Sequence, residues 1–328
     1  QRADEVIDSL KEKGMRTDVD QGVLDDAFRQ FSMSFDEENG GFGGAPKFPS
    51  PHDLMFLMRY QVREDDDWAL KMVLKTLDKM KEGGIYDHLG YGFHRYSTDE
   101  KWKLPHFEKM LYDQAMMMLA YTEAYHITKD ELYRKTVEEI TRYLERNLMH
   151  EDGAFFSSED ADVEGREGEY YLWTKDEIVE VLDEGEIFID VFNVEEEGNY
   201  EEESSGRKTG KNVLHMKEDV GKLAERYDLS EEELMGKLDE QKKKLFEERM
   251  KRRRPRVDDK ILTDWNGLLI AALAKAGFVF DNNRYTEMAE DAVGFIYREM
   301  VDEEGRLYHS YIDGTVSVLG LLDDFASL

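Results

Sequence analysis

The sequence contains no cysteine among its 328 residues. Disulfides, thiolate metal sites and cysteine nucleophiles are therefore excluded, and we expect a reducing, cytoplasmic location. Proline is scarce, with five residues, which favours uninterrupted helices. No run of about 18 apolar residues occurs, so we expect no transmembrane helix and no membrane partner. The charged, amphipathic stretch Gln1–Leu10 is unlike a signal peptide.

Basic residues are heavily outnumbered. Lys and Arg total 44 against 75 Asp and Glu, which gives a formal net charge of −31. Nucleic-acid binding depends on basic side chains that neutralise phosphates, so we expect no nucleic-acid partner. The hydrophobic share of 40% and the aromatic share of 12% are too high for a disordered chain. The composition predicts a globular protein with an acidic, solvated surface.

Apolar residues recur at three- and four-residue steps through most of the chain, which predicts an all-α protein. The segments after these helices share a Gly-containing turn followed by an aromatic-rich piece, and such recurrence indicates repeated helical hairpins closed into an (α/α) toroid. Long loops at one end of a toroid form a cleft. The predicted helices are Val23–Phe35, His52–Tyr60, Asp67–Lys81, Phe107–Tyr125, Glu131–Leu148, Glu231–Arg253, Trp265–Phe280 and Tyr285–Met300.

Two segments of strongly biased charge interrupt this rhythm. Residues 195–210 are first acidic and then Ser/Gly-rich, which predicts an exposed loop within the barrel domain. The basic run Gln241–Arg256 is open to two interpretations, an anion-binding helix or a helix face that neutralises acidic neighbours, and we favour the second.

The loop 83–113 holds the densest set of reactive side chains. Carboxylates and arginine bind hydroxyl groups, and aromatic rings stack on sugars, so this composition suits a sugar or acid ligand. Pro105 fits the first turn of a helix, which would place His106 and Glu108 at its N-terminus. A helix N-terminus lowers the pKa of a nearby histidine, so His106 would be a neutral general base, or else a packed loop residue. The candidates here are Asp87, His88, His94, Arg95, Tyr96, Trp102, His106, Glu108 and Asp113.

Two further loops carry clustered carboxylates. Glycoside hydrolysis needs two carboxyl groups at a suitable separation, which the sequence alone does not provide. The spacing of a calcium loop is absent, as are the zinc, nucleophile-elbow, Walker and dinucleotide motifs, so we expect no metal and no cofactor. The candidates in these loops are Asp160, Asp162, Glu167, Asp259, Asp264, Trp265 and Asn266.

Four long motifs, taken in order, resemble one family. They are GGFGGAPKFPSP from Gly40, GIYDHLGYGFHRYSTDEKWKLPHFEKMLYDQA from Gly84, SSEDADVEGREGEYYLW from Ser157, and RRRPRVDDKILTDWNGLLIAALA from Arg252. The chain is similar over nearly all its length to the YyaL / spermatogenesis-associated protein 20 family. The resemblance implies a six-hairpin, glycosidase-like (α/α)6 toroid over residues 1–328, related to N-acylglucosamine 2-epimerases. It also implies an additional thioredoxin-like domain and further hairpins, so we expect this toroid to be incomplete at its C-terminus.

Three functions stay open at this stage. The first is a sugar epimerase or isomerase in which His106 or His88 moves a proton, with Arg95 and Glu108 holding the sugar. The second is a glycoside hydrolase with a carboxylate pair drawn from Glu108, Asp160, Asp162, Asp259 and Asp264. The third is a non-catalytic scaffold that presents a ligand or protein to the thioredoxin-like domain. Family resemblance does not decide among them, because one fold serves many functions.

Overall fold

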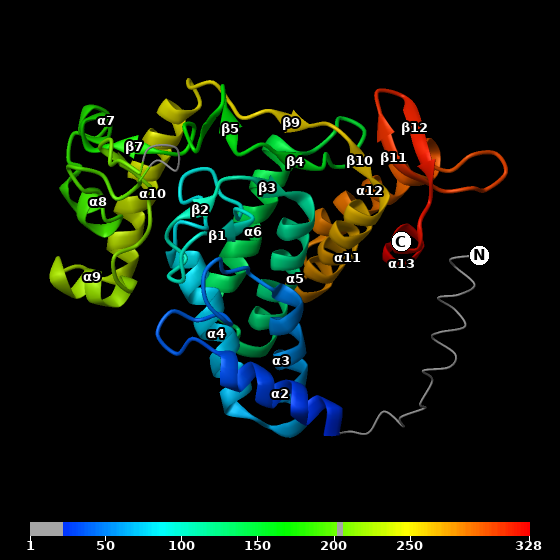
Figure 1. Ribbon diagram of the computed structural model, residues 1–328, viewed down its shortest axis with the longest axis horizontal. Coiled ribbons are helices and arrows are strands. Elements are labelled where there is room, and N and C mark those ends of the chain that lie inside the picture. The colour runs from blue at the N-terminus through cyan, green and yellow to red at the C-terminus, as the bar shows by residue number, and fades with distance from the viewer. Residues whose placement is uncertain (1–21, 202–205) are drawn as a thin grey trace.

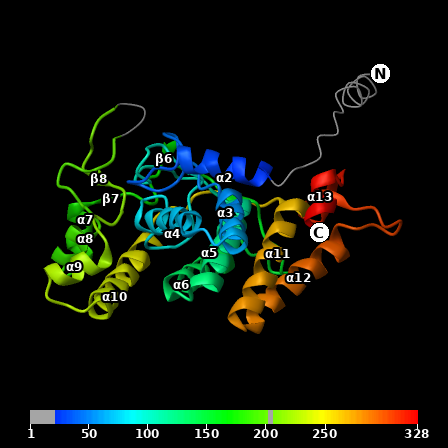
Figure 2. The ribbon, with the colours of Figure 1, turned by 90° about the horizontal axis from the view of Figure 1, so that it is seen from below.

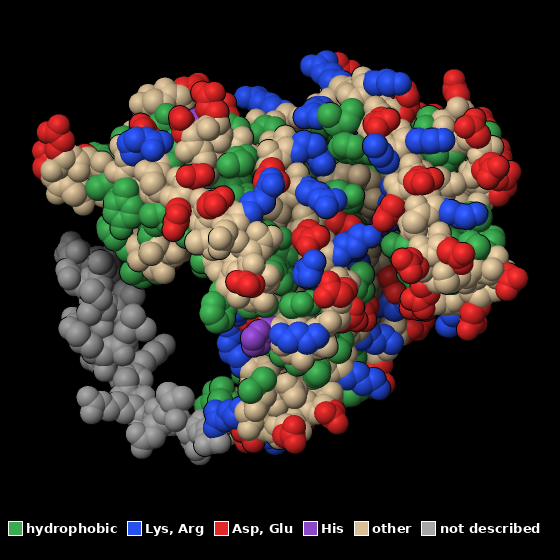
Figure 3. Space-filling view, turned by 180° about the vertical axis from the view of Figure 1, so that it is seen from behind, with side chains coloured by type: hydrophobic (Ala, Val, Ile, Leu, Met, Phe, Trp, Pro, Cys, Tyr) green, Lys and Arg blue, Asp and Glu red, His purple; other side chains and the backbone are tan. Residues whose placement is uncertain are grey.

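The computed structural model describes residues 22–201 and 206–328, and these fold mainly into helices (Figure 1). The predicted stretch Gln1–Leu10 and the middle of the predicted loop 195–210 lie outside the described residues. None of the helices in the described ranges is long and apolar enough to cross a membrane. On the face shown in Figure 3, acidic side chains are interspersed with lysines and arginines.

Three helical hairpins repeat along the described chain. Each has a two-residue link whose first residue is left-handed and whose second residue caps the next helix with its side chain: Asp65-Asp66, Lys129-Asp130 and Asp281-Asn282. An N-cap side chain satisfies a backbone N–H that the first helical turn leaves unpaired. The hairpins are α3 (Pro51–Glu64) with α4 (Asp67–Glu82), α5 (Leu111–Thr128) with α6 (Glu131–Asn147), and α11 (Thr263–Phe280) with α12 (Asn283–Glu299).

The hairpins stand side by side in an arc (Figures 1 and 2). Helices α3, α5 and α11 pack against one another as the inner layer, which continues with the short α13 (Leu322–Ser327). Helices α4, α6 and α12 lie behind them, and α2 (Gly22–Ser34) packs on α3 and α4. The main hydrophobic cluster fills the space between the two layers. This arrangement confirms the predicted toroidal class.

One predicted helix boundary is wrong in a way that affects the site. The helix expected from Phe107 begins at Leu111, because the residues before it pair as short strands. Pro105 and His106 form β2, which pairs with Tyr96 and Ser97 of β1. Consequently His106 and Glu108 lie in a strand-like loop and not at a helix N-terminus.

Short strands connect loops that are far apart in the sequence. In one sheet, Met110 is opposite Ser158, and Ser158 is opposite Asp258, which brings together the segments before α5 and α11. The two-residue strands are β1 (Tyr96–Ser97), β2 (Pro105–His106), β3 (Lys109–Met110), β4 (Ser158–Glu159), β5 (Asp162–Val163), β6 (Arg166–Glu167), β7 (Trp173–Thr174), β8 (Lys211–Asn212), β9 (Val257–Asp258) and β10 (Ile261–Leu262).

A longer hairpin, β11 (Tyr308–Ile312) with β12 (Thr315–Leu319), was not predicted. Its turn is Asp313-Gly314, and both residues have positive φ, 45° and 80°. Asp-Gly between two β-rich runs is a strong hairpin signal. The sequence therefore contains a signal for this hairpin.

Residues between α6 and α11 build a lobe beside the arc, formed by α7 (Lys175–Val181), α8 (Glu186–Val191), α9 (Val220–Arg226) and α10 (Glu231–Arg249). It has its own hydrophobic cluster, centred on residues such as Phe188, Phe192 and Leu234. The first and last of these helices begin with capping boxes at Thr174 and Ser230, in which the cap and the third helical residue satisfy each other's backbone N–H groups.

Candidate active site

The site lies at the end of the arc where the inner helices begin. The tight two-residue links occupy the opposite end, so the long loops before α5, α11 and α13 all gather here. Five side chains meet in these loops and are called the rim cluster below: Arg95, His106, Glu108, Asp113 and Glu167. All five are among the predicted candidates, and they come from two of the predicted loops.

His106 is at the centre of the rim cluster. Its Nδ1 lies 2.7 Å from Glu167 Oε1 and its Nε2 lies 3.5 Å from Glu108 Oε2. Glu167 Oε1 also accepts the backbone N–H of Phe107 at 3.2 Å. Arg95 Nη1 donates to Glu108 Oε2 at 2.9 Å. The imidazole is therefore oriented by one carboxylate and presented towards another.

The electrostatics of His106 reverse the sequence-based expectation. The hydrogen bond that His106 donates to Glu167 raises the pKa of His106 above 6.5, although burial opposes this shift. The same hydrogen bond lowers the pKa of Glu167. The expectation of a lowered histidine pKa was wrong because the helix N-terminus on which it depended begins further along, at Leu111. A histidine with a raised pKa is still suited to both giving and taking a proton near neutral pH.

Aromatic rings cover the sides of the rim cluster. Tyr96 stacks on His106 with ring centroids 5.0 Å apart, and Phe48 packs on Tyr96 at 4.9 Å. On the α11 side, Tyr112 meets Trp265 edge to face at 4.8 Å. Tyr112 belongs to the same loop motif as the predicted candidates. Such rings provide apolar surfaces for a ligand that also carries polar groups.

Asp113 is the unusual carboxyl group of the rim cluster. It lies in the first turn of α5, and its Oδ2 is buried with no hydrogen-bond partner among the described residues. Burial raises the pKa of Asp113 to about 8; Glu108 adds to this shift, and Arg95 opposes it. At neutral pH, Asp113 is therefore mostly a neutral acid that can donate a hydrogen bond.

A cavity of about 360 Å³ adjoins the rim cluster and shares Glu108 with it. It includes the predicted Asp160 and Asp259, both exposed, together with the basic side chains of Arg256 and Lys260. We call it the acidic cavity; its lining residues are Glu108, Ser158, Asp160, Arg256, Asp258, Asp259 and Lys260. The β3–β4–β9 pairing brings these loops together.

Five other candidates are buried in structural contacts and do not face the rim cluster. Trp102 is fully buried and donates from Nε1 to the carbonyl of Asn39 at 3.0 Å. Asn266 is fully buried and exchanges two hydrogen bonds with the backbone of Phe155. Asp87 forms a buried ion pair with Arg249 of α10. This pair also explains part of the basic run, which does neutralise an acid, but inside the protein.

The two remaining buried candidates are histidines whose burial disfavours the charged form. His88 contacts the carbonyl of Gly83 at 2.9 Å through Nε2, and burial, helped by Lys242 and Lys81, lowers its pKa to about 3. His94 contacts the carbonyl of Phe107 at 2.9 Å through Nδ1. Burial and Lys109 hold the pKa of His94 well below 6.5. Neither ring is placed to exchange protons with a ligand at the rim.

Asp162 and Asp264 are not members of the rim cluster. Asp162 is exposed on β5, opposite Glu167. Asp264 is the second residue of α11, where its backbone N–H donates to Asp324 Oδ1 at 3.1 Å. His309 of β11 joins Asp324 through Nδ1 at 2.9 Å. The pattern of the sequence did not point to His309 as a site residue.

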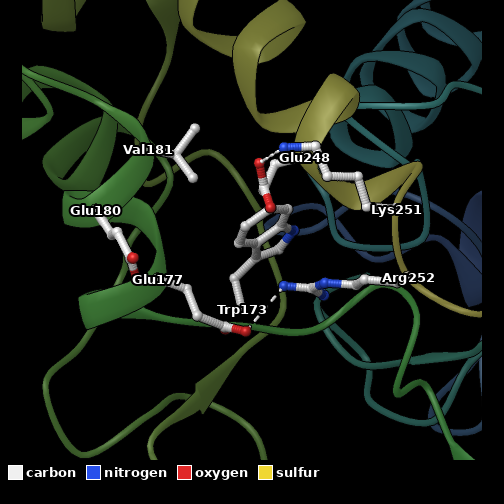
Figure 4. Close-up of a pocket in the computed structure, with 7 residues that line it drawn as sticks. All are labelled: Trp173, Glu177, Glu180, Val181, Glu248, Lys251 and Arg252. Carbon is white, nitrogen blue, oxygen red and sulfur yellow. Dashed lines mark hydrogen bonds and ion pairs between the residues drawn. The ribbon is translucent and has the colours of Figure 1, made fainter.

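The largest cavity of those compared lies in the lobe, between α7 and α10 (Figure 4), at about 680 Å³. Trp173 stands at its centre, but the Arg252 guanidinium lies 4.0 Å from the ring centroid. Arg252 is also paired with Glu177 at 3.1 Å. Because this ring face is already covered, the lobe cavity is less suited to sugar stacking than the rim.

Comparison with known proteins gives the relationship by sequence. No family model matches the chain. Spermatogenesis-associated protein 20 of Homo sapiens is 37% identical over 331 residues, which cover 91% of this chain and 42% of that protein. The proteins of that name from Rattus norvegicus and Mus musculus match to the same extent.

Two solved structures have low overall similarity. The cellobiose 2-epimerase of Bacillus thermoamylovorans is 14% identical, covers 92% of this chain and 94% of its own, and gives a TM-score of 0.38. A glycoside hydrolase family 76 mannosidase from Bacteroides thetaiotaomicron is 9% identical, covers 88% and 57%, and gives 0.47. By sequence, the chain is a homologue of spermatogenesis-associated protein 20 that spans less than half the length of those relatives.

Proposed function

We propose that the rim cluster is the catalytic centre of a carbohydrate-active enzyme of the sugar epimerase or isomerase type. The observation that carries the proposal is the fixed orientation of His106, whose Nδ1 is held by Glu167 while its Nε2 points to Glu108. A histidine whose second nitrogen is fixed by a carboxylate is a well-prepared general acid and base.

The proposed reaction is a proton transfer next to a sugar carbonyl. His106 takes the proton from the carbon beside the carbonyl, and Asp113, as a neutral acid, donates a hydrogen bond to the carbonyl oxygen as negative charge develops there. Return of the proton to the neighbouring carbon, with transfer of the hydroxyl proton to the former carbonyl oxygen, gives the isomer. Return to the same carbon inverts it only when the enediol turns its opposite face to His106. Arg95 and Glu108 orient sugar hydroxyl groups, and Tyr96 supplies an apolar surface.

A glycoside hydrolase is the second candidate, and the acidic cavity favours it. Glu108, Asp160, Asp258 and Asp259 line one space, and two carboxyl groups are what glycoside cleavage requires. The third candidate is a binding scaffold. For the whole protein, we propose a thioredoxin-like domain as a partner, which the family resemblance implies, and a cytoplasmic location.

The test is solvent exchange at the reacting carbon. The full-length protein is incubated in D2O with glucose, mannose, N-acetylglucosamine or cellobiose, and deuterium at the carbon next to the carbonyl is followed by NMR. The variant His106→Gln should slow exchange by roughly 10²–10⁴-fold. The control is His126→Gln, which changes an exposed histidine near the far end of α5.

Three results would overturn the proposal. Exchange at the wild-type rate in His106→Gln would remove this residue from the mechanism. Release of new reducing ends, abolished by Glu108→Gln, would establish the hydrolase instead. Sugar binding without exchange or cleavage would establish the scaffold.

A further inference from the structure

Three side chains from three separate elements converge beside the rim cluster, at the right-hand end of the arc in Figure 1. They are Asp264 of α11, His309 of β11 and Asp324 of α13. One potential ligand atom from each lies within 4.8 Å of the other two. The rim cluster uses none of these residues.

The fold holds this group in place from both sides. Leu262, just before α11, is opposite Ser310 in the β10–β11 pairing, which fixes the neighbouring His309. Helix α13 approaches α11 closely at Gly267, where an added Cβ would lie 2.7 Å from the carbonyl oxygen of Ser327. A side chain at this position would push α13, and Asp324 with it, away from α11.

We propose that Asp264, His309 and Asp324 bind one divalent cation of the Mn²⁺ or Zn²⁺ class. One imidazole nitrogen and two carboxylate oxygens are a mixed set of ligands that suits these ions better than Ca²⁺, which prefers oxygen alone. Three protein ligands leave positions open for water or a substrate oxygen, as in metal sites that take part in reactions.

The charges around the group are unbalanced in a way that a cation would correct. Asp324 is fully buried, with 0% exposure, and Asp264 lies beside it. Within the described residues, neither carboxylate has an ion pair with a lysine or arginine. Asp324 relies on His309 and on the backbone N–H groups of Asp264 and Leu321, at 3.1 and 2.7 Å. Buried charges are otherwise paired or coordinate metals.

The same contacts suit metal binding. Backbone N–H groups that donate to a ligating carboxylate fix its orientation, and such outer partners are a regular part of metal sites. His309 Nδ1 lies 2.9 and 3.1 Å from the two oxygens of Asp324, so both groups already face the same point. On binding, the ion would take the place of the proton in the hydrogen bond between His309 and Asp324.

The proposed cation lies close to the candidate active site. Trp265 follows Asp264 in α11 and contacts Tyr112, whose neighbour in the chain is Asp113 of the rim cluster. A bound ion would add positive charge to this acidic end of the arc. The proposed ion site does not depend on which reaction the rim cluster performs, so it is tested by measuring metal binding and not turnover.

The experiment is a titration of the full-length protein, first stripped with chelator, with Mn²⁺ and separately with Zn²⁺. Calorimetry should give one tight ion per chain, and thermal denaturation should show a higher Tm with added ion. Bound Mn²⁺ should show nitrogen coupling from one imidazole by pulsed electron paramagnetic resonance. Asp264→Asn and His309→Gln should each weaken binding by more than roughly tenfold.

The matched control is Asp323→Asn, which removes an exposed carboxylate next to Asp324 in the same helix. Asp264 and His309 are only partly buried, so their substitutions test the proposal even when a change at the fully buried Asp324 prevents folding. The proposal is overturned when neither ion binds below millimolar concentration. It is also overturned when Asp323→Asn weakens binding as much as Asp264→Asn does, because the ions would then bind to general surface charge.

Discussion

The buried ion pair between the lobe and the arc allows a quantitative prediction. Arg249 Nη1 and Nη2 each lie 2.8 Å from an oxygen of Asp87, and Lys109 Nζ lies 2.8 Å from Oδ2 of the same carboxylate. The exposures of Arg249, Asp87 and Lys109 are 2%, 6% and 1%. Burial alone would raise the pKa of Asp87, but Arg249 and Lys109 together hold it well below 3.8.

The two single substitutions should therefore differ in cost. Removing one partner of a buried pair costs about 3–5 kcal/mol, because a charge is left uncompensated. In Arg249→Met, Lys109 still compensates Asp87, so we expect about 2–3 kcal/mol, below that range. In Asp87→Asn, Arg249 and Lys109 both lose their ion-pair partner, so we expect the upper end, about 4–5 kcal/mol.

Urea unfolding followed by circular dichroism measures these differences. The control is Arg284→Met, which breaks an exposed pair with Glu145 and should cost less than about 1 kcal/mol. The pKa of Asp87 is depressed in the folded state, so its stabilisation is present above pH 3.8 and is lost in more acidic solution. The reasoning is refuted when Arg249→Met costs as much as Asp87→Asn, or when both match the control.

Three further predictions concern the site. Glu167→Gln should lower the pKa of His106 towards 6.5, measured by NMR titration, and an unchanged pKa would contradict the assigned hydrogen bond. The variant should also lose more stability at pH 6 than at pH 9, because a raised histidine pKa stabilises the folded state only at pH values below that pKa. Gly168→Ala should destabilise the protein more than Gly165→Ala does, measured by thermal denaturation. The φ angles of Gly168 and Gly165 are similar, 72° and 75°, but only at residue 168 would an added Cβ meet Phe107, at 2.5 Å. Asp113→Asn should stabilise the protein by an amount that grows from pH 4 to pH 8. The pKa of Asp113 is about 8 in the folded protein, so over this range the unfolded chain gains stability by ionising Asp113 and the folded protein does not. A gain independent of pH would show that Asp113 is ionised in the folded protein.

The sequence predicted the helices well where burial follows a helical period. The expected helix Asp67–Lys81 differs from α4 by one residue at its end, because its apolar positions face one layer of the arc. The start of α5 was misplaced because Phe107 and Met110 continue the apolar spacing. Their burial comes from strand and aromatic partners outside the helix, such as Ser158 for Met110, and His94 and Tyr171 for Phe107. Helical periodicity does not encode such pairing.

For the site, residue type and loop position selected candidates but did not separate functional from structural ones. His88, His94 and His106 lie in one loop and look equivalent in the sequence. The difference is burial: the first two are 4% and 2% exposed, while the His106 side chain keeps 27%. Arg249 shows the same limit, since its charge was evident but its place inside the protein depends on Asp87, far away in the sequence.

The insertion of the lobe between α6 and α11 has a consequence for how the protein folds during synthesis. Helix α5 packs most closely on α11, yet all four helices of the lobe leave the ribosome between them. Until α11 appears, the side of α5 that it covers remains open to water, and closing such a long loop carries an entropic cost. An apolar face of α5 is therefore exposed for the whole time that the lobe is synthesised. We expect the chain to be most prone to aggregation at this stage, because exposed hydrophobic surface promotes association.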